Sequence, residues 1–292
     1  MMGAVPQPFD AVDRAYAAEL QREPDRRTRW LLQQTAATGP SRRALIGSLG
    51  VAAGARVLDV GTGFGCVPLE LAAIAAVTAV GVDVDVDVLG AATRIAESAA
   101  ASGGLVPGSS VRFHAADVLA LPFAAASFDV ATVRFVYEHI ADRDLATDEL
   151  ARVLRPGGLA CVVDVDDGLS ISDPEPSAAF ARVANAFRAA QAARGGDRYV
   201  GRTLARLLDA GGFDVTAVLV LPQAAYGPSL PSDPGRALLL ERLRLARADM
   251  VATGLLDDSE LDADLADLAA EVVHGQCQVE AHLAVVGRRR PD

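Results

Sequence analysis

Residues 57–65, which read Val-Leu-Asp-Val-Gly-Thr-Gly-Phe-Gly, constrain the fold of this chain more than any other stretch. Their first part is a short apolar run, typical of a strand that is buried in a parallel sheet. Gly61, Gly63 and Gly65 then allow a tight turn and let a ligand lie directly against the backbone, which any Cβ would prevent. Pro68 follows closely and suits the first turn of a helix.

A helix that begins at such a turn favours an anionic group. Its first N–H groups lack partners inside the helix, and the helix dipole adds partial positive charge at this end. A three-glycine turn does not identify the ligand, because dinucleotide-binding enzymes use a similar one. A turn that binds nothing is the other interpretation.

Two further strands each bring an acid. Residues 78–83 are an apolar run that ends in Asp83, and residues 111–118 are a third strand whose acid is Asp117. At the end of the second strand of a doubly wound sheet, an acid binds ribose hydroxyls. A nicotinamide-binding fold does not require the third acid, whereas an adenine amino group could donate a hydrogen bond to it.

In these stretches the chain resembles the class I S-adenosylmethionine-dependent methyltransferases. Residues 57–65 match the glycine motif of that family, residues 121–130 match its approach to the fourth strand, and residues 154–158 match the turn before the fifth. The resemblance implies an α/β fold, a Rossmann-like doubly wound sheet of seven strands with strand seven antiparallel, and a helical cap. It also implies S-adenosylmethionine as the cofactor.

The resemblance assigns roles to individual residues. The glycine turn holds the methionyl end of the cofactor, Asp83 takes both ribose hydroxyls, and Asp117 accepts a hydrogen from the adenine 6-amino group. Val84 lies against the adenine face and the N–H of Val118 lies near the ring. The expected cofactor-binding residues are Asp59, Gly61, Thr62, Gly63, Gly65, Asp83, Val84, Asp117, Val118 and Arg134.

Residues 134–140 follow the fourth strand, 128–134, and are expected beside the reactive methyl group, because ligands lie beyond the carboxyl ends of such strands. In-line attack on a carbon that positive sulfur activates depends mainly on alignment. His139 has a suitable pKa for a base if the acceptor must lose a proton; packing at the strand end is the alternative. The candidate acceptor contacts are Tyr137, Arg198 and Tyr199.

Glu138 and His139 also raise the question of a metal. Some family members bind a divalent ion here through Glu-x-x-Glu-His, but Phe135 stands at the position of the first glutamate. We therefore expect no metal.

The sequence outside these motifs predicts an N-terminal lid and a cap. Residues 1–50 are expected to form an N-terminal helical lid with helices over 10–22, 26–35 and 41–49, the last capped by Ser41. Residues 51–292 form the methyltransferase domain, with cap inserts at about 166–199 and 222–277. The second insert predicts helices over 234–253 and 259–273, and Ser259 and Asp262 would form a capping box for the latter.

Composition restricts the partners. The net charge of −11 disfavours nucleic acids and anionic membranes and mildly favours a cationic ligand such as the sulfonium. Three scattered cysteines, an N-terminus unlike a signal peptide and the lack of a membrane-spanning apolar run favour a cytoplasmic protein. A homodimer formed through the second insert is left open.

The sequence thus predicts methyl transfer to a small organic acceptor. Oxygen, nitrogen and carbon acceptors are not distinguished; a natural-product intermediate fits the long cap better than a quinone precursor. Two alternatives remain. One is a nicotinamide-dependent oxidoreductase, and the other is a protein that binds the cofactor without methyl transfer, as a sensor or as a scaffold for a rearrangement or cyclisation.

Overall fold

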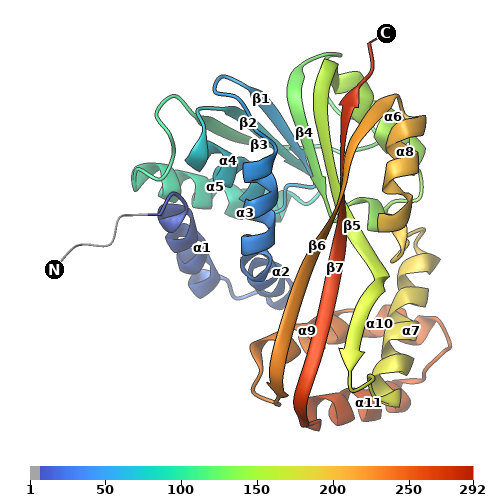
Figure 1. Cartoon of the computed structure of the whole chain (residues 1–292). Helices are drawn as coiled ribbons and strands as arrows, with labels where there is room; N and C mark the ends of the chain where they lie inside the picture. Colours follow the sequence, from blue (N-terminus) through green and yellow to red (C-terminus); the bar gives the residue numbers. More distant parts are fainter. Residues whose placement is uncertain (1–6, 292) are drawn as a thin grey trace.

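The structure, a computed structural model, describes residues 7–291 and contains a seven-stranded sheet with helices on both faces (Figure 1). The strand order is β3-β2-β1-β4-β5-β7-β6; β1 to β5 are parallel, and β7 is antiparallel to β5 and β6. The strands are β1 (Arg56–Val60), β2 (Thr78–Asp83), β3 (Ser110–Ala115), β4 (Phe128–Arg134), β5 (Leu154–Asp173), β6 (Phe213–Ser229) and β7 (Val273–Arg289). This topology confirms the predicted fold class.

The helices fall into two layers and a cap. They are α1 (Asp10–Arg22), α2 (Arg26–Ala37), α3 (Gly39–Ser48), α4 (Cys66–Ile74), α5 (Val86–Ala101), α6 (Arg143–Val153), α7 (Ala178–Ala193), α8 (Leu204–Ala210), α9 (Pro234–Leu245), α10 (Arg247–Ala252) and α11 (Asp258–Ala270), with 3₁₀ turns η1 (Tyr137–His139) and η2 (Val200–Thr203). None of the helices in the described part of the chain is long and apolar enough to cross a membrane.

Both faces of the central strands are buried, which explains their continuous apolar sequences. Val57 of β1 packs into a core that includes side chains of α1, α3, α4 and α5. Its neighbours Leu58 and Val60 pack into a second core with α6 and α8. The period-2 alternation of a strand therefore divides one short run between two helical layers.

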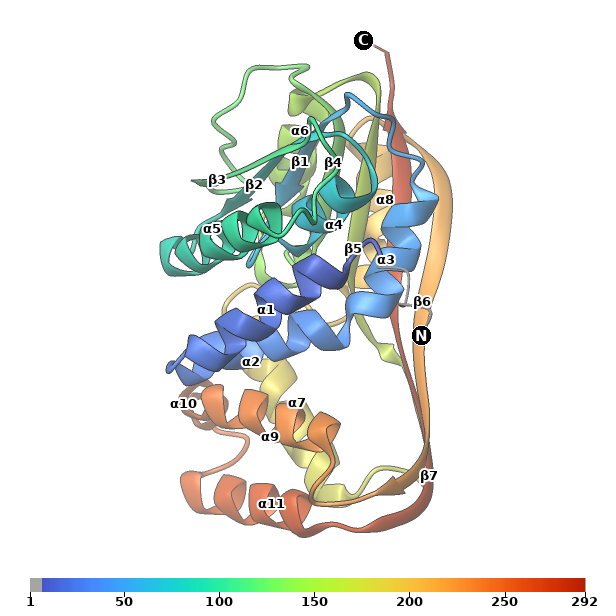
Figure 2. The same cartoon turned by 90° about the vertical axis from the view of Figure 1, so that its left-hand side faces the viewer.

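β5, β6 and β7 are much longer than the other strands and run past the core toward the cap (Figures 1 and 2). Pairing of β5 with β7 stops at Val165 and resumes at Ser170, after a shift in register. Residues 166–173 are polar and contain a glycine, so they read as a loop. Antiparallel pairing between distant segments supplies backbone partners there, and the local sequence carries no signal for it.

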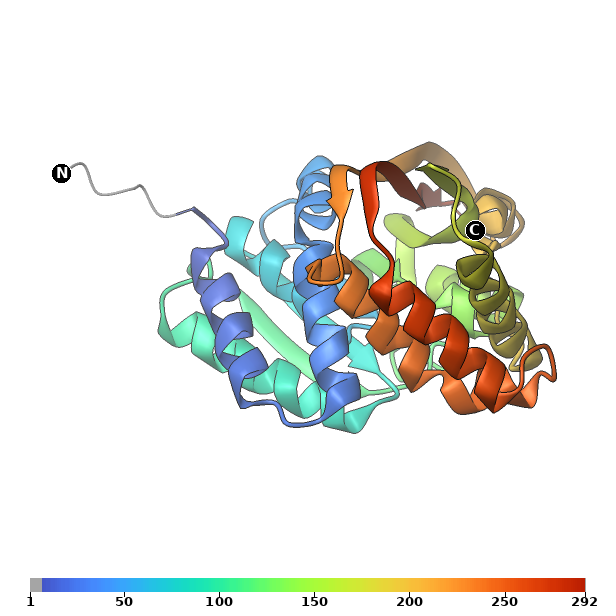
Figure 3. The ribbon, with the colours of Figure 1, turned by 90° about the horizontal axis from the view of Figure 1, so that it is seen from below.

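The cap has a core of its own, formed by α7, α9, α10 and α11 (Figures 2 and 3). The single predicted helix over 234–253 is two helices, which meet at Ala246. The capping box before α11 is made by Asp257 and Glu260, two residues earlier than predicted, because Asp257 satisfies the first N–H groups of the helix.

The N-terminal helices touch both the core and the cap. The Tyr16 hydroxyl of α1 donates to the carbonyl of Phe64 in the glycine turn at 2.8 Å, and Nε1 of Trp30 in α2 donates to the carbonyl of Leu238 in α9 at 2.8 Å. α3 begins at Gly39 with Pro40 in its first turn, so Ser41 lies inside the helix and is not its cap. The division at residue 50 stays a prediction.

Candidate cofactor and acceptor site

The glycine turn after β1 has one position that is open to a ligand. Gly61, Gly63 and Gly65 have φ of +67°, +52° and +74°. A Cβ at Gly61 would lie 2.1 Å from Cγ2 of Val136, and one at Gly65 would lie 2.4 Å from Cζ of Phe113. A Cβ at Gly63 would meet nothing within 4 Å. Gly61 and Gly65 are therefore needed for packing, whereas Gly63 faces free space.

Asp83 is held against this turn. Its Oδ2 accepts from the N–H of Gly63 at 2.9 Å, and its Oδ1 accepts from the N–H of Asp85 at 3.1 Å. β2 and β3 are neighbours and pair Asp83 with Ala115, so Asp117 follows at the same sheet edge. The side chain of Val84 is 69% exposed beside them. Gly63, Asp83 and Asp117 thus lie on three adjacent strand ends, in the order that an extended cofactor requires.

Asp59 and Thr62 are buried beneath the turn. Asp59 is 2% exposed, accepts from the Thr132 hydroxyl at 2.6 Å, and has a pKa that burial raises to about 6. Thr62 is 3% exposed, and its hydroxyl lies against Gly81. The role of Thr62 in cofactor binding stays a prediction: its hydroxyl faces the sheet, and its N–H already donates to the carbonyl of Val82 at 2.9 Å.

Arg134 ends β4 as a cation next to the glycine turn. Its guanidinium lies 4.2 Å from the centroid of the Phe135 ring, and burial lowers its pKa to about 10. Within residues 7–291, the Arg134 side chain has no hydrogen-bonding or ion-pair partner. A desolvated, unpaired guanidinium of this kind is suited to a carboxylate.

Tyr137 is a core residue, so its prediction as an acceptor contact is wrong. It is fully buried, and its hydroxyl is 2.9 Å from the Thr147 hydroxyl of α6. Burial raises the pKa of its phenol well above the usual value. The 3₁₀ turn points this ring into the core below the sheet edge, which the sequence does not reveal.

Glu138 and Arg198 form a buried ion pair under the cap. Arg198 also donates to Oδ1 of Asp167 at 2.8 Å, and Nε2 of Gln191 donates to Oε2 of Glu138 at 2.8 Å. Burial alone would raise the pKa of Glu138, but Arg198, with smaller contributions from His139, Arg242 and Gln191, offsets this and the pKa is lowered. Arg198 therefore lies where it was predicted to act, but its charge is already paired.

Tyr199, the other predicted contact on this loop, is 39% exposed, and the Arg202 guanidinium lies 5.0 Å from its ring centroid.

His139 is the accessible member of this group. Its side chain is 60% exposed, and its Nε2 is 3.8 Å from Oε1 of Glu138. Nε2 of Gln191 lies 3.4 Å from its Nδ1. The surrounding protein displaces water and lowers the pKa of His139, and Glu138 opposes this only in part. The imidazole is therefore neutral near pH 7, which is the form that a base requires.

Asp164 positions the turn that carries these residues. It is fully buried in the middle of β5, directly after Val163, which pairs with the last residue of β4. Its carboxylate accepts from the N–H of Glu138 at 3.1 Å and from the N–H of its neighbour Val165 at 2.8 Å. Burial raises the pKa of its carboxyl well above the usual value. Neither Asp164 nor Gln191 was among the predicted site residues; Asp164 lies in a run of acids, and Gln191 comes from a cap helix without a motif.

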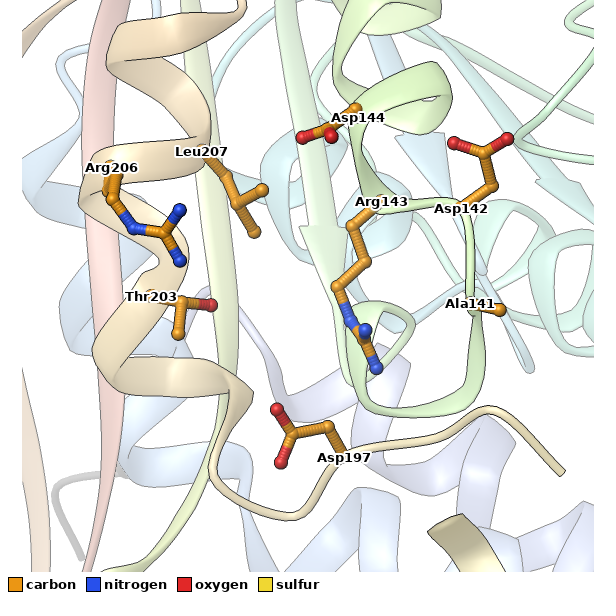
Figure 4. Close-up of a pocket in the computed structure, with 8 residues that line it drawn as sticks. All are labelled: Ala141, Asp142, Arg143, Asp144, Asp197, Thr203, Arg206 and Leu207. Atoms are coloured by element: carbon orange, nitrogen blue, oxygen red, sulfur yellow. The ribbon is translucent and has the colours of Figure 1, made fainter. Parts of the chain in front are cut away.

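A cavity of about 270 Å³ lies away from these residues, between the start of α6 and the η2–α8 segment (Figure 4). Figure 4 shows Arg143 and Asp144 on one side of it and Thr203 and Arg206 on the other. None of the predicted cofactor residues lines this cavity, so it is not the predicted cofactor site.

Comparison with known proteins identifies a methyltransferase domain within the chain. Residues 58–162 match the sequence model of that domain. The chain is 38% identical over 129 residues to the demethylmenaquinone methyltransferase of Thermus thermophilus, covering 44% of this chain and 52% of that protein. It is 33% identical over 144 residues to the O-methyltransferase resE of Aspergillus sclerotiorum, covering 49% and 52%.

The domain also has the fold of the [4+2]-cyclase SpnF, with a TM-score of 0.51, 21% identity, and coverage of 86% of this chain and 80% of that one. The chain spans about half the length of the curated relatives that it matches. The matched residues include most of β1, all of β2 to β4 and all of the candidate cofactor residues, whereas the cap helices lie outside them.

Proposed function

We propose that this protein transfers the methyl group of S-adenosylmethionine to a small organic acceptor. The observation that carries the proposal is the open face of Gly63, joined by a hydrogen bond to Asp83. The two relatives described above are named as methyltransferases: one is a demethylmenaquinone methyltransferase and the other is an O-methyltransferase. A natural-product intermediate is the acceptor class that best suits the long cap.

The residues at the sheet edge fit the cofactor. Asp83 would bind the ribose hydroxyls, Val84 would cover the adenine, and Asp117 and the N–H of Val118 would bind its edge. The backbone of the glycine turn would hold the methionyl end, and Arg134 would pair with its carboxylate. When bound, the cofactor supplies a methyl carbon that is activated by positive sulfur.

His139 is the candidate base. It is exposed beside the end of β4, neutral near pH 7, and held by Gln191 and Glu138. It would accept a proton from a hydroxyl or amine acceptor, while alignment of the acceptor with the methyl group supplies most of the rate. The cap and the N-terminal helices enclose this side of the sheet, which favours a small acceptor over a macromolecule (Figure 2).

Two measurements test the proposal. Calorimetric titration with S-adenosylmethionine, S-adenosylhomocysteine and NAD should show binding of the first two only; tight binding of NAD alone would support the oxidoreductase. Incubation with donor labelled on the methyl group and a panel of phenolic and amine acceptors should then give labelled product. Cofactor binding without transfer to any acceptor would favour a sensor or a scaffold.

A further inference from the structure

Arg242 of α9 is a second cation without a partner, on the cap side of the site. Its guanidinium carbon lies 4.5 Å from the ring centroid of Phe187 in α7 and 5.8 Å from that of Trp30 in α2. In the part of the chain that the structure describes, its side chain forms neither a hydrogen bond nor an ion pair. Contacts with ring faces leave the N–H edge of a guanidinium free to donate.

Two of the three carboxylates near Arg242 are already paired with other cations, and the third, Glu280 of β7, is exposed and accepts from the side chain of Gln278 at 2.8 Å. Glu138 and Asp167 both bind Arg198, and Nη1 of Arg188 is 3.7 Å from Oδ2 of Asp167. Glu241, the residue before Arg242, pairs with Arg26 of α2 at 2.7 Å. Arg242 thus has no buried carboxylate left to pair with.

The pKa values of neighbouring groups reflect burial and the nearby guanidinium groups. Burial and the nearby Arg198 lower the pKa of Arg242 to about 10, so it remains a cation at pH 7. His282 of β7 lies 4.8 Å, ring to ring, from Phe135, and burial together with Arg134, Arg198 and Arg242 lowers its pKa to about 4. Keeping a guanidinium out of water without a counter-charge is costly, so an anionic ligand would be stabilised strongly here.

We propose that Arg242 binds an oxyanion group, a carboxylate or a phosphate, on the methyl acceptor. This inference rests on the proposed function and narrows its substrate class to acceptors with an apolar body and one anionic end. Arg134 lies on the other side, beside the glycine turn, and is left for the carboxylate of the cofactor. Arg134 would therefore bind the carboxylate of the cofactor, and Arg242 would bind the anionic group of the acceptor.

The test uses three probes with the same octyl chain: nonanoate, octyl phosphate and octanol. Their affinities for the full chain are measured by calorimetry, with and without S-adenosylhomocysteine. We expect at least one anion to bind about tenfold or more tighter than octanol, and Arg242→Met to remove that difference. The tighter anion identifies the group. Arg244→Met is the matched control, because Arg244 lies on the same helix and is exposed.

Arg242→Lys separates charge from geometry, since lysine keeps the charge but loses the planar fork. It should retain part of the preference for anions, and it serves as the folded comparison if the Met variant is unstable. Equal affinity for all three probes, or an anion preference that survives Arg242→Met, would refute the inference. S-adenosylhomocysteine affinity is measured in parallel and should not change. Failure of the wild-type chain to bind it contradicts the proposed function; intact binding without an anion preference contradicts this inference alone.

Discussion

The carboxylate of Asp83 accepts a hydrogen bond from the backbone N–H of Gly63, with 2.9 Å between Oδ2 and N. The bond joins the end of β2 to the turn after β1, so the acid and the open glycine are fixed relative to each other. Asp83 keeps lone pairs for further donors, since each carboxylate oxygen can accept more than one bond. The ribose and the methionyl end of one cofactor would therefore bind to a single preformed unit.

Asp83→Ala should weaken S-adenosylmethionine binding by about 1.5–3 kcal/mol, or roughly 10- to 150-fold, because charge-assisted hydrogen bonds to the ribose are lost. Calorimetric titration measures this directly. Asp87→Ala is the control, since Asp87 is an exposed acid in the first turn of α5. Unchanged affinity in Asp83→Ala would show that the ribose lies elsewhere.

Gly63→Ala should mainly affect cofactor binding, whereas Gly65→Ala should mainly affect stability. At Gly63 a methyl group meets no protein atom, so the fold should lose only about 1–2 kcal/mol from the left-handed backbone, while cofactor binding is abolished by steric exclusion. At Gly65 a methyl group would overlap Phe113, so unfolding itself should become markedly easier. Urea denaturation and cofactor titration of both variants separate the effects. Normal binding by Gly63→Ala would contradict the assignment of the turn.

The cofactor half of the site was predictable because its signals are local. The glycine turn directly follows the apolar residues of a buried strand, so both are visible in one short stretch of sequence. Asp83 ends its strand in the sequence as it does in the structure. Asp85 caps α5 through a similarly local contact, since its side chain accepts from the N–H groups of Asp87 and Val88. In each case neighbouring residues determine the geometry.

The acceptor half was less predictable because tertiary packing determines it. Tyr137 and His139 lie two residues apart, but one is buried and the other exposed, since a single 3₁₀ turn carries both. Arg242 resembles any arginine on a polar helix face until α7 and α2 are packed against it. The long β5–β7 ribbon depends on pairing between distant segments, so polar stretches within it read as loops.

His139→Ala should slow methyl transfer without changing cofactor affinity if the imidazole is the base. In the wild type, the rate should rise with pH and level off below pH 7, because burial lowers the pKa of His139 from its ordinary value of 6.5. Glu138 opposes that shift, so Glu138→Gln should move the rising limb to lower pH. A pH–rate profile of kcat/KM for the three proteins checks both points, and full activity of His139→Ala would assign the residue a structural role.

The free energy of unfolding should depend on pH because of Asp59. Burial raises its pKa from 3.8 to about 6, so the native state binds this proton more tightly than the unfolded chain does. The contribution of protonated Asp59 to the free energy of unfolding is fully present below about pH 4 and is lost as the pH rises toward 6. The total loss is at most about 3 kcal/mol.

Asn mimics the protonated acid, so Asp59→Asn should gain stability relative to the wild type across this window and hold the gain at higher pH. Urea denaturation at pH 4, 5, 6 and 7 measures the difference between the two proteins. A difference that does not vary with pH would show that Asp59 titrates normally.

The Arg42–Glu70 pair should be the strongest ionic link between the N-terminal helices and the core. Nε and Nη2 of Arg42 in α3 donate to the two carboxylate oxygens of Glu70 in α4, each at 2.7 Å, and the side chains are 3% and 0% exposed. Glu70 also accepts from Nε of Arg43 at 2.8 Å, so loss of Arg42 leaves Glu70 with one partner, whereas loss of Glu70 leaves the buried Arg42 guanidinium without a counter-charge. Glu70→Leu should therefore lower the free energy of unfolding by about 3–5 kcal/mol, and Arg42→Met should lower it by less.

The double variant removes both charges and should recover much of the loss, because well-packed apolar groups can replace a buried pair. Asp13→Ala is the control, since it breaks the exposed pair with Arg43 and should cost less than about 1 kcal/mol. Denaturation curves of the wild type, the two single variants and the double variant form a double-mutant cycle. Strictly additive losses would show that the two charges act independently, and that α3 is held to the core by apolar packing alone.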